Sequence, residues 1–275
     1  MDKFNIAKRL LRLLQKHSDI TKADGIEDVF QLFSRGACRE AYAALCEMMK
    51  EQPDLCAHAF TCVLHADLSL YVKGDTCEAQ KSLDRAQGKL GCSEPKIASY
   101  YYRVQGDVKS RLGNTSEAVD DYEKSVALSP DISNLTMLAQ SLSVLRDARA
   151  PDVWVRVLEE DPQNSKAYVW LARQAARSGD RDKAISLAKK AEQLKPFAED
   201  VFDVACLYHD IGQPEAALSA YFRADAMGYE GRDCLYAAIA DCYRQLGKAD
   251  KAKEYAQRAL ECGPGDGASR GRTLF

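Results

Sequence analysis

The sequence predicts an all-α protein built as one array of stacked helical pairs. Small residues recur at intervals of 32 to 39 residues along the 275-residue chain. A glycine stands five residues before most of them, where one helix would end and the next would begin. No linker of distinct composition divides the chain, although it is longer than a typical single domain. An extended repeat array accounts for these three observations together.

The recurring small residue is an alanine, which we expect on the packed face of the second helix of each pair. These alanines are Ala41, Ala79, Ala118, Ala150, Ala184, Ala217 and Ala252. A packing residue follows four positions later on the same helical face, namely Leu45, Leu83, Tyr122, Trp154, Ala188, Tyr221 and Ala256. The preceding glycines are Gly36, Gly74, Gly113, Gly179, Gly212 and Gly247. Because glycine accepts the left-handed conformation, it is expected to turn the chain between the two helices.

Prolines then close successive units, since proline cannot continue a helix; they are Pro53, Pro130, Pro162, Pro196 and Pro264. Together these residues resemble the tetratricopeptide repeat family over roughly residues 22–264. The resemblance is most specific at 165–196 and 233–264. It implies a right-handed superhelical solenoid of about seven antiparallel helical pairs, at about 22–53, 60–91, 99–130, 131–162, 165–196, 198–229 and 233–264.

Two units depart from the family pattern. The unit at 131–162 lacks the turn glycine, has Leu138 where a small residue is expected, and carries Pro151 near the start of its second helix. The unit near 60–91 has Asp67 at the small-residue position and extra length on both sides. We expect irregular packing in the first case and lengthened helices or loops in the second.

The two ends of the chain differ in character. Residues 1–21 form an amphipathic stretch, with an apolar stripe that includes Phe4 and Leu11 opposed by basic residues, which predicts a helix capping the first repeat. A membrane-surface or organelle-targeting helix is the alternative. At the other end, residues 265–275 contain too few apolar residues to form a core, which predicts a disordered tail.

Composition indicates which partners and locations to expect. The formal net charge is −3 at pH 7, whereas nucleic-acid binding usually requires a clearly basic face, so we do not expect a nucleic-acid partner. No apolar run is long enough to span a bilayer and no secretion signal is recognisable, so we expect a soluble, cytoplasmic protein without a membrane span. The ten cysteines are scattered through helical patterns, which favours reduced and mostly buried thiols over disulfides.

The sequence shows no familiar catalytic motif, and we predict neither an enzyme nor a cofactor. One cluster resembles a metal site in outline: Cys56, His58, Cys62 and His65 lie within ten residues, three of them at helical spacing on one face. Cys56 would point to the opposite side of that helix, and thiols are commonly buried in cores. Packed core residues are therefore the preferred interpretation, with a transition-metal site as the alternative.

The family resemblance also implies where partners would bind. In such arrays the first helices of the pairs line a concave groove, and set positions of those helices point into it. These positions hold Tyr100, Arg103, Asp107, Arg111, Lys166, Arg173, Arg177, Phe202 and His209. Five basic side chains, from Arg103 to Arg177, are expected to form a positive patch for carboxylates or phosphates; ordinary solvated helix faces are the alternative. Co-chaperones of this family bind the acidic C-termini of heat-shock proteins with lysine and asparagine at set groove positions. No three consecutive units of this chain hold that set, so we do not predict binding to heat-shock proteins.

The resulting hypothesis is a non-catalytic scaffold or adaptor that grips a partner protein or peptide, with an acidic segment, in the groove. The alternatives are a regulatory or substrate-docking subunit of an enzyme complex, and a chaperone for a secreted or assembling protein.

Overall fold

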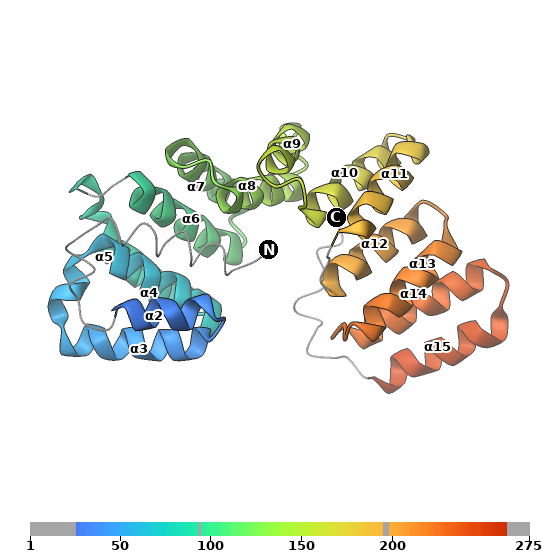
Figure 1. Ribbon diagram of the computed structural model, residues 1–275, viewed down its shortest axis with the longest axis horizontal. Coiled ribbons are helices and arrows are strands. Elements are labelled where there is room, and N and C mark those ends of the chain that lie inside the picture. The colour runs from blue at the N-terminus through green and yellow to red at the C-terminus, as the bar shows by residue number, and fades with distance from the viewer. Residues whose placement is uncertain (1–25, 93–94, 195–197, 263–275) are drawn as a thin grey trace. The chain divides into compact units, whose positions relative to one another are not determined.

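The computed structural model describes residues 26–92, 95–194 and 198–262, and throughout these ranges the regular structure is helical, without strands (Figure 1). The expected capping helix at 1–21 and the expected tail at 265–275 lie outside the described residues, as does Pro196. The described helices form two compact units that divide between Val153 and Trp154. This division falls inside a helix, α9, and each unit is described by itself below.

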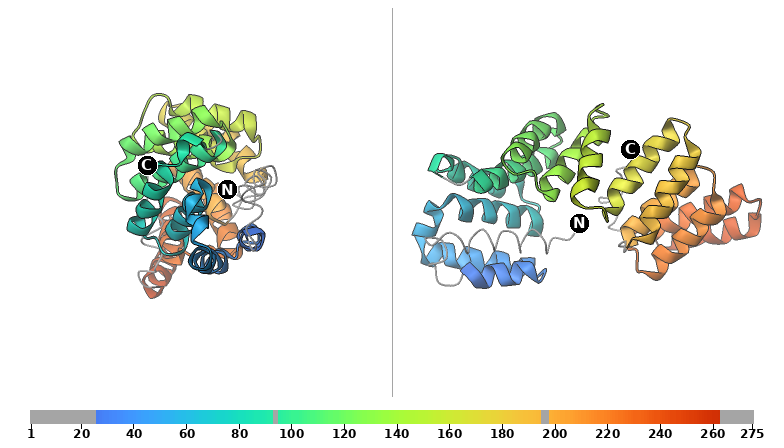
Figure 2. Two further views of the ribbon diagram at one scale, coloured as in Figure 1. Left: turned by 90° about the vertical axis from the view of Figure 1, so that its left-hand side faces the viewer. Right: turned by 45° about the horizontal axis from the view of Figure 1, so that its top comes forward.

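In the first unit, α2 packs on α3, α4 on α5, and α6 on α7, and α8 follows against α7. The paired helices lie side by side in the additional views as well (Figure 2). The helices are α2 (Ile26–Ser34), α3 (Cys38–Glu51), α4 (Ala59–Val72), α5 (Thr76–Gln87), α6 (Pro95–Arg111), α7 (Thr115–Leu128) and α8 (Ile132–Val144). This pairing is the helical hairpin that the recurring alanines and glycines predict.

In the second unit, α10 packs on α11, α12 on α13, and α14 on α15. The first helices of successive pairs also contact one another, α10 with α12 and α12 with α14. These helices are α10 (Ser165–Arg177), α11 (Arg181–Gln193), α12 (Ala198–Asp210), α13 (Pro214–Ala226), α14 (Arg232–Gln245) and α15 (Ala249–Glu261), and α9 (Ala150–Glu160) contains the division.

Short-range chemistry sets where these helices begin. Asp75 accepts a hydrogen bond from the backbone N–H of Glu78 at 2.9 Å, and Asp180 accepts one from that of Lys183 at 3.1 Å. Asn164 does the same for Ala167 at 3.1 Å. Each side chain satisfies an N–H group that the first helical turn leaves without an intrahelical partner.

The turns inside the pairs use the predicted glycines. All six have positive φ, between 67° and 85°. The unit without a turn glycine uses Arg146 instead, at φ 55°, and Asp147 N–H then bonds to the carbonyl of Leu142 at 2.9 Å. Pro151 lies in the first turn of α9, where proline is tolerated because its missing N–H has no intrahelical acceptor.

The extra length beside α4 folds into two short 3₁₀ turns, η1 (Pro53–Ala57) and η2 (Leu90–Cys92). Pro53 begins η1, and His58 then adopts an extended conformation, with φ −93° and ψ 126°, before α4 starts at Ala59. Cys56 and His58 therefore do not belong to the helix that carries Cys62 and His65, which corrects the expectation of a single helix across all four residues.

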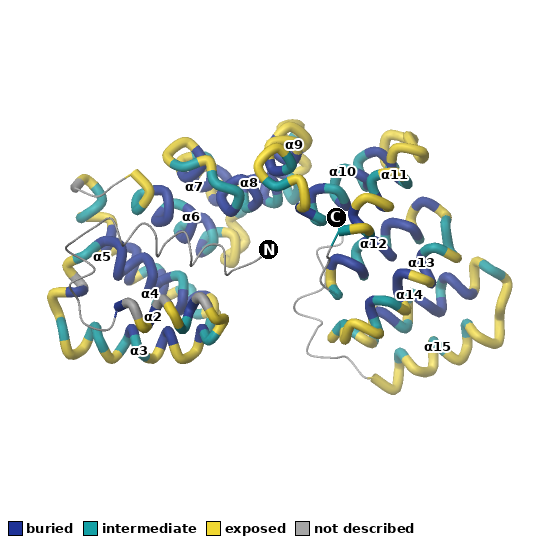
Figure 3. The backbone as a smooth tube through the Cα atoms, viewed as in Figure 1, coloured by how far each residue is buried: buried dark blue, intermediate teal, exposed yellow. Residues whose placement is uncertain are grey.

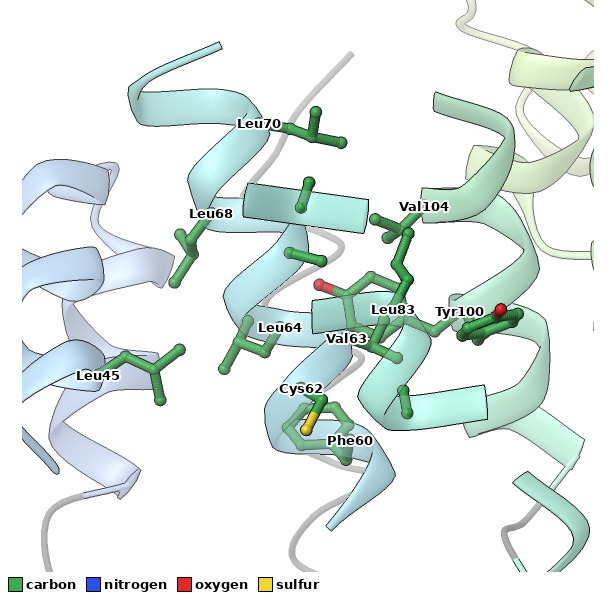
Figure 4. Close-up of a cluster of buried hydrophobic side chains, with 14 of the residues drawn as sticks. Leu45, Phe60, Cys62, Val63, Leu64, Leu68, Leu70, Leu83, Tyr100 and Val104 are labelled. Carbon is green, nitrogen blue, oxygen red and sulfur yellow. The ribbon is translucent and has the colours of Figure 1, made fainter. Parts of the chain in front are cut away.

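The core of the first unit surrounds α4, which lies between α3 and α6 (Figure 4). Eleven of the fourteen residues of α4 are buried, so this helix is apolar on nearly all sides. Leu64 and Cys62 are fully buried and Phe60 is 2% exposed. Leu45 and Leu83, both predicted as packing residues, are also fully buried in this cluster.

The core of the second unit is built largely from small residues. Ala184, Ala188, Ala217 and Ala220 are fully buried, which lets neighbouring helices approach closely, while Tyr221 fills the larger space at 1% exposure. The last described helix differs, because α15 contains no buried residue and much of its surface is exposed (Figure 3). Ala256 is exposed, so its predicted packing role is wrong.

Of the eight cysteines whose side chains the structure describes, three are buried, two half-buried and three exposed. Burial of the cysteines is therefore less general than predicted. Among the described residues, no helix combines the length and apolar character needed to cross a membrane.

Candidate functional site

Three predicted groove residues of the first unit meet in one network of charged and phenolic groups. Arg103 in α6 donates from Nη1 to Asp107 Oδ2 at 2.7 Å and from Nη2 to Asp67 Oδ2 in α4, also at 2.7 Å. Tyr100 donates its hydroxyl hydrogen to Asp67 Oδ2 at 2.7 Å, and Tyr122 in α7 donates to Asp107 Oδ1 at 2.7 Å. The network thus joins a first helix to the preceding first helix and to its own partner helix.

This network is largely shielded from water. The side chain of Arg103 is 8% exposed, and those of Asp67 and Asp107 are 18% and 20% exposed. Burial raises the pKa of Asp107, although the charge of Arg103 opposes the change. Burial by itself would lower the pKa of Arg103, but the carboxylates of Asp67 and Asp107 reverse that effect and raise it. Arg103 therefore stays charged, with both carboxylates holding its guanidinium.

Asp67 explains why its unit departs from the family pattern. The expected small residue would leave room at this position for the neighbouring first helix, and Asp67 fills that room with a carboxylate that binds Arg103 and Tyr100. A small residue does occur at the corresponding position of the next unit, Gly106, where the ring of Tyr122 passes directly over the backbone. Asp67 therefore contacts the next first helix, whereas Gly106 makes room for a ring of its own partner helix.

The other predicted basic residue of the first unit, Arg111, is exposed at the end of α6. Its neighbour Lys109 is half-buried and lies 2.7 Å from Asp121 Oδ2 of α7. Of the two predicted arginines on α6, therefore, Arg111 presents its charge to solvent whereas Arg103 is occupied inside the unit.

In the second unit, three predicted basic residues lie on α10. Arg177 is exposed and Lys166 is half-buried, and neither has an ion-pair partner within 4.0 Å among the described residues. Arg173 is half-buried, with Nη2 at 3.3 Å from Asp203 Oδ1 on α12, in a pair whose side chains are 25% and 46% exposed. Such a partly exposed pair contributes little stability.

Phe202 on α12 is part of an aromatic stack. Its ring lies 4.4 Å from that of Tyr229, with an angle of 9° between the planes, and 5.5 Å from that of Tyr221. The hydroxyl of Tyr221 donates to Cys206 Sγ at 3.4 Å, and burial raises the pKa of the Cys206 thiol to about 11. Phe202 is half-buried in these contacts, with only part of its surface open to a partner.

His209, the last predicted groove residue, bridges to the next first helix. Its Nε2 lies 3.0 Å from Asp241 Oδ2 and 2.9 Å from Nε2 of Gln245, both on α14. Arg244 also lies 2.6 Å from Asp241 Oδ1. Separate polar contacts therefore join α10 to α12 and α12 to α14.

The four residues considered as an alternative metal site do not share one helix. Cys62 is fully buried in the core, while His65 Nδ1 lies 2.9 Å from Ser82 Oγ and its Nε2 lies 3.5 Å from Cys46 Sγ. His58 precedes α4 as its N-cap residue. In the described part of the chain, no group of three or more histidine, cysteine, aspartate or glutamate residues is arranged to hold a metal ion.

Sequence reasoning missed the acidic partners Asp67, Asp203 and Asp241, each of which pairs with a predicted groove residue. These partners lie 30 to 36 residues from the residue they bind. That separation is close to one repeat, so a search for opposite charges one repeat apart on successive first helices would have found all three.

Comparisons with known proteins agree with this architecture. A family profile described as a tetratricopeptide repeat matches residues 99–132 and 235–261. No curated protein sequence matches the chain. A tetratricopeptide repeat protein from Parabacteroides merdae superposes with a TM-score of 0.61 at 16% identity, covering 86% of this chain and 91% of that one.

A second solved structure, the APC/C hetero-tetramer Cut9-Hcn1, superposes with a TM-score of 0.60 at 15% identity. The match covers 93% of this chain and 49% of that chain, so this protein corresponds to about half of it. At these identities the similarity concerns the fold. The helical pairs and their turn glycines, together with the two matched segments, show that the chain contains tetratricopeptide repeats.

Proposed function

We propose that the protein is a non-catalytic scaffold that binds a partner polypeptide along the first helices of its repeats. The observation that carries this proposal is the polar surface of α10, α12 and α14, linked by contacts from Arg173 to Asp203 and from His209 to Asp241. Successive first helices of the second unit contact one another, so these groups form a continuous wall. A peptide lying across the wall meets charged groups on each helix.

The charge of the wall changes from α10 to α12 and α14, and this change indicates which chemical groups of a partner would bind at α10. Lys166, Arg173 and Arg177 make α10 basic, whereas Asp203, Asp210 and Asp241 make α12 and α14 more acidic. An acidic segment of the partner, with carboxylate or phosphate groups, fits at α10. Arginine suits this role because its planar guanidinium can donate two hydrogen bonds to one anion.

The proposal also concerns the cellular location of the protein and whether it is an enzyme. The eight described cysteines do not pair with one another in disulfides, which fits a protein of the reducing cytoplasm. Tetratricopeptide repeats serve in general as interaction modules, and the chain carries no familiar catalytic motif. We therefore propose that the protein acts as a cytoplasmic adaptor rather than as an enzyme.

The test is binding of acidic, neutral and basic peptide pools to the immobilised full chain. Arg173→Glu combined with Arg177→Glu should weaken binding of the acidic pool by about tenfold or more, and added salt should weaken wild-type binding. Lys183→Glu combined with Lys189→Glu is the matched control, because it makes the same charge change at exposed positions of α11. Equal loss in both double variants, or none in either, would exclude α10 as the recognition surface.

A further inference from the structure

A cysteine and a histidine outside the proposed binding wall form a nucleophile and base pair in the first unit. Cys46 of α3 is half-buried, and its Sγ lies 3.5 Å from Nε2 of His65 in α4. The other ring nitrogen of His65 lies 2.9 Å from Ser82 Oγ in α5. Three helices thus hold the imidazole with one nitrogen directed at the thiol.

The hydrogen-bond pattern assigns the proton on this imidazole. Ser82 Oγ lies 3.1 Å from the backbone carbonyl of Glu78, to which it donates its only hydrogen. From this contact we infer that Nδ1 of His65 carries the hydrogen and donates it to Ser82 Oγ. Nε2 is left with its lone pair facing Cys46, so it can accept the thiol proton.

The surrounding charges affect both protonation states of His65. Burial lowers the pKa of His65, and the nearby charges of Arg85 and Lys73 lower it further, whereas Glu78 raises it. The ring is therefore neutral at pH 7 and free to act as a base. Once Nε2 is protonated, Glu78 Oε1 at 3.8 Å stabilises the new charge.

Four other cysteines of the described chain differ from Cys46 in their surroundings. Burial raises the pKa of the Cys206 thiol to about 11 and that of the Cys242 thiol to about 12, which keeps both protonated. Cys77 and Cys262 are exposed, and no histidine nitrogen bonds to either of them among the described residues. An ordinary thiol with a pKa of about 8.5 is only about 3% thiolate at pH 7, so a neighbouring base makes a large difference.

We propose that Cys46 is a modification site at which a small neutral electrophile with a leaving group reacts, assisted by His65. The thiol proton moves to His65 Nε2 as sulfur attacks. With iodoacetamide as the probe, a carbon–sulfur bond forms, the carbon–iodine bond breaks and iodide leaves. The proton then passes from His65 to water, so that atoms and charge balance without an oxidant.

The test is the rate of iodoacetamide alkylation at each cysteine of the full chain at pH 7, followed by peptide mass spectrometry. Cys46 should react at least about fivefold faster than Cys77 or Cys262, although it is less exposed. A Cys46 rate below those of both exposed cysteines would overturn the proposal without any variant.

The variant His65→Asn separates assistance by the imidazole from simple exposure. The asparagine amide can still donate to Ser82, but it offers no base to Cys46. Alkylation of Cys46 should fall to about one fifth or less of the wild-type rate, while Cys77 and Cys262 in the same sample keep theirs. An unchanged Cys46 rate in a variant that retains wild-type helicity would show that His65 has no part in the reaction.

Discussion

Gly106 lies so close to the ring of Tyr122 that a Cβ added to it would be 2.6 Å from Cε1 of Tyr122. Gly106→Ala must therefore displace the ring and its hydrogen bond to Asp107. We expect the free energy of unfolding to fall by about 2–4 kcal/mol, because overpacking and a lost buried hydrogen bond add. Urea denaturation followed by circular dichroism measures this loss.

The control for that substitution is Gly88→Ala. Gly88 has φ −65° and nothing within 4 Å of an added Cβ. Its replacement should leave stability within about 0.5 kcal/mol of wild type or raise it slightly. Similar effects of the two substitutions would mean that the approach of Tyr122 to Gly106 is not tight.

Removing Asp67 leaves a buried arginine with one carboxylate fewer. Asp67→Ala should destabilise the protein by about 2–4 kcal/mol, since breaking a buried pair uncovers a charge and also frees the hydroxyl of Tyr100. Asp120→Ala, at an exposed position of α7, should change stability by less than about 0.5 kcal/mol. Chemical denaturation of both variants decides whether the network stabilises the unit.

Glycine should suit the left-handed backbone conformation at position 146 better than Arg146 does. Arg146→Gly is expected to stabilise the protein by about 0.5–1 kcal/mol, because glycine avoids the steric cost of positive φ while adding some entropy to the unfolded chain. Arg146→Ala is the control, as it removes the side chain but keeps the Cβ. If thermal melting shows alanine to be as stabilising as glycine, the arginine side chain rather than the backbone is responsible.

The protonation of His65 predicts a pH dependence of stability. Its pKa is lowered in the folded state by burial, so the unfolded chain binds the proton more tightly. Stability from this group is present above the ordinary pKa of 6.5 and is lost as pH falls toward the lowered value. The slope should not exceed about 1.4 kcal/mol per pH unit.

Urea denaturation between pH 7.5 and 5 measures this slope, and His65→Asn should flatten it. Glu78 changes stability in a lower pH range, because its pKa lies below the ordinary value of 4.5. A variant with the same slope as wild type above pH 5 would assign the dependence to other groups.

The helical pairs were predictable because their determinants are local. Ala184 and Gly179 lie within one hairpin, and each residue acts through a property of its own, small size or tolerance of positive φ. The turn at Arg146 was not predictable, since arginine has no preference for that conformation and the surrounding helices impose it. The break before α4 was missed because the 3₁₀ turn after Pro53 has no strong sequence signature.

The contacts of the proposed binding surface were only partly predictable. Repeat positions predict which side chains of a first helix point toward the groove, but they do not predict which side chains the neighbouring helix places beside them. Arg103 and Arg173 occupy comparable regions of their helices, yet Arg103 is enclosed by two carboxylates and Arg173 meets one exposed carboxylate. The difference comes from Asp67, a residue on the preceding repeat.

Asp67 also bears on how the repeats find their correct neighbours during folding. Helical pairs of similar shape can stack in the wrong order, a known hazard of repeat proteins. The position of Arg103 is occupied in the following units by Leu135, Val169, Phe202 and Ala237. Any of those helices seated on α4 would bury the Asp67 carboxylate without a cation, at a cost of several kcal/mol. The pair therefore disfavours the first helices of these four units as neighbours of α4 and favours α6.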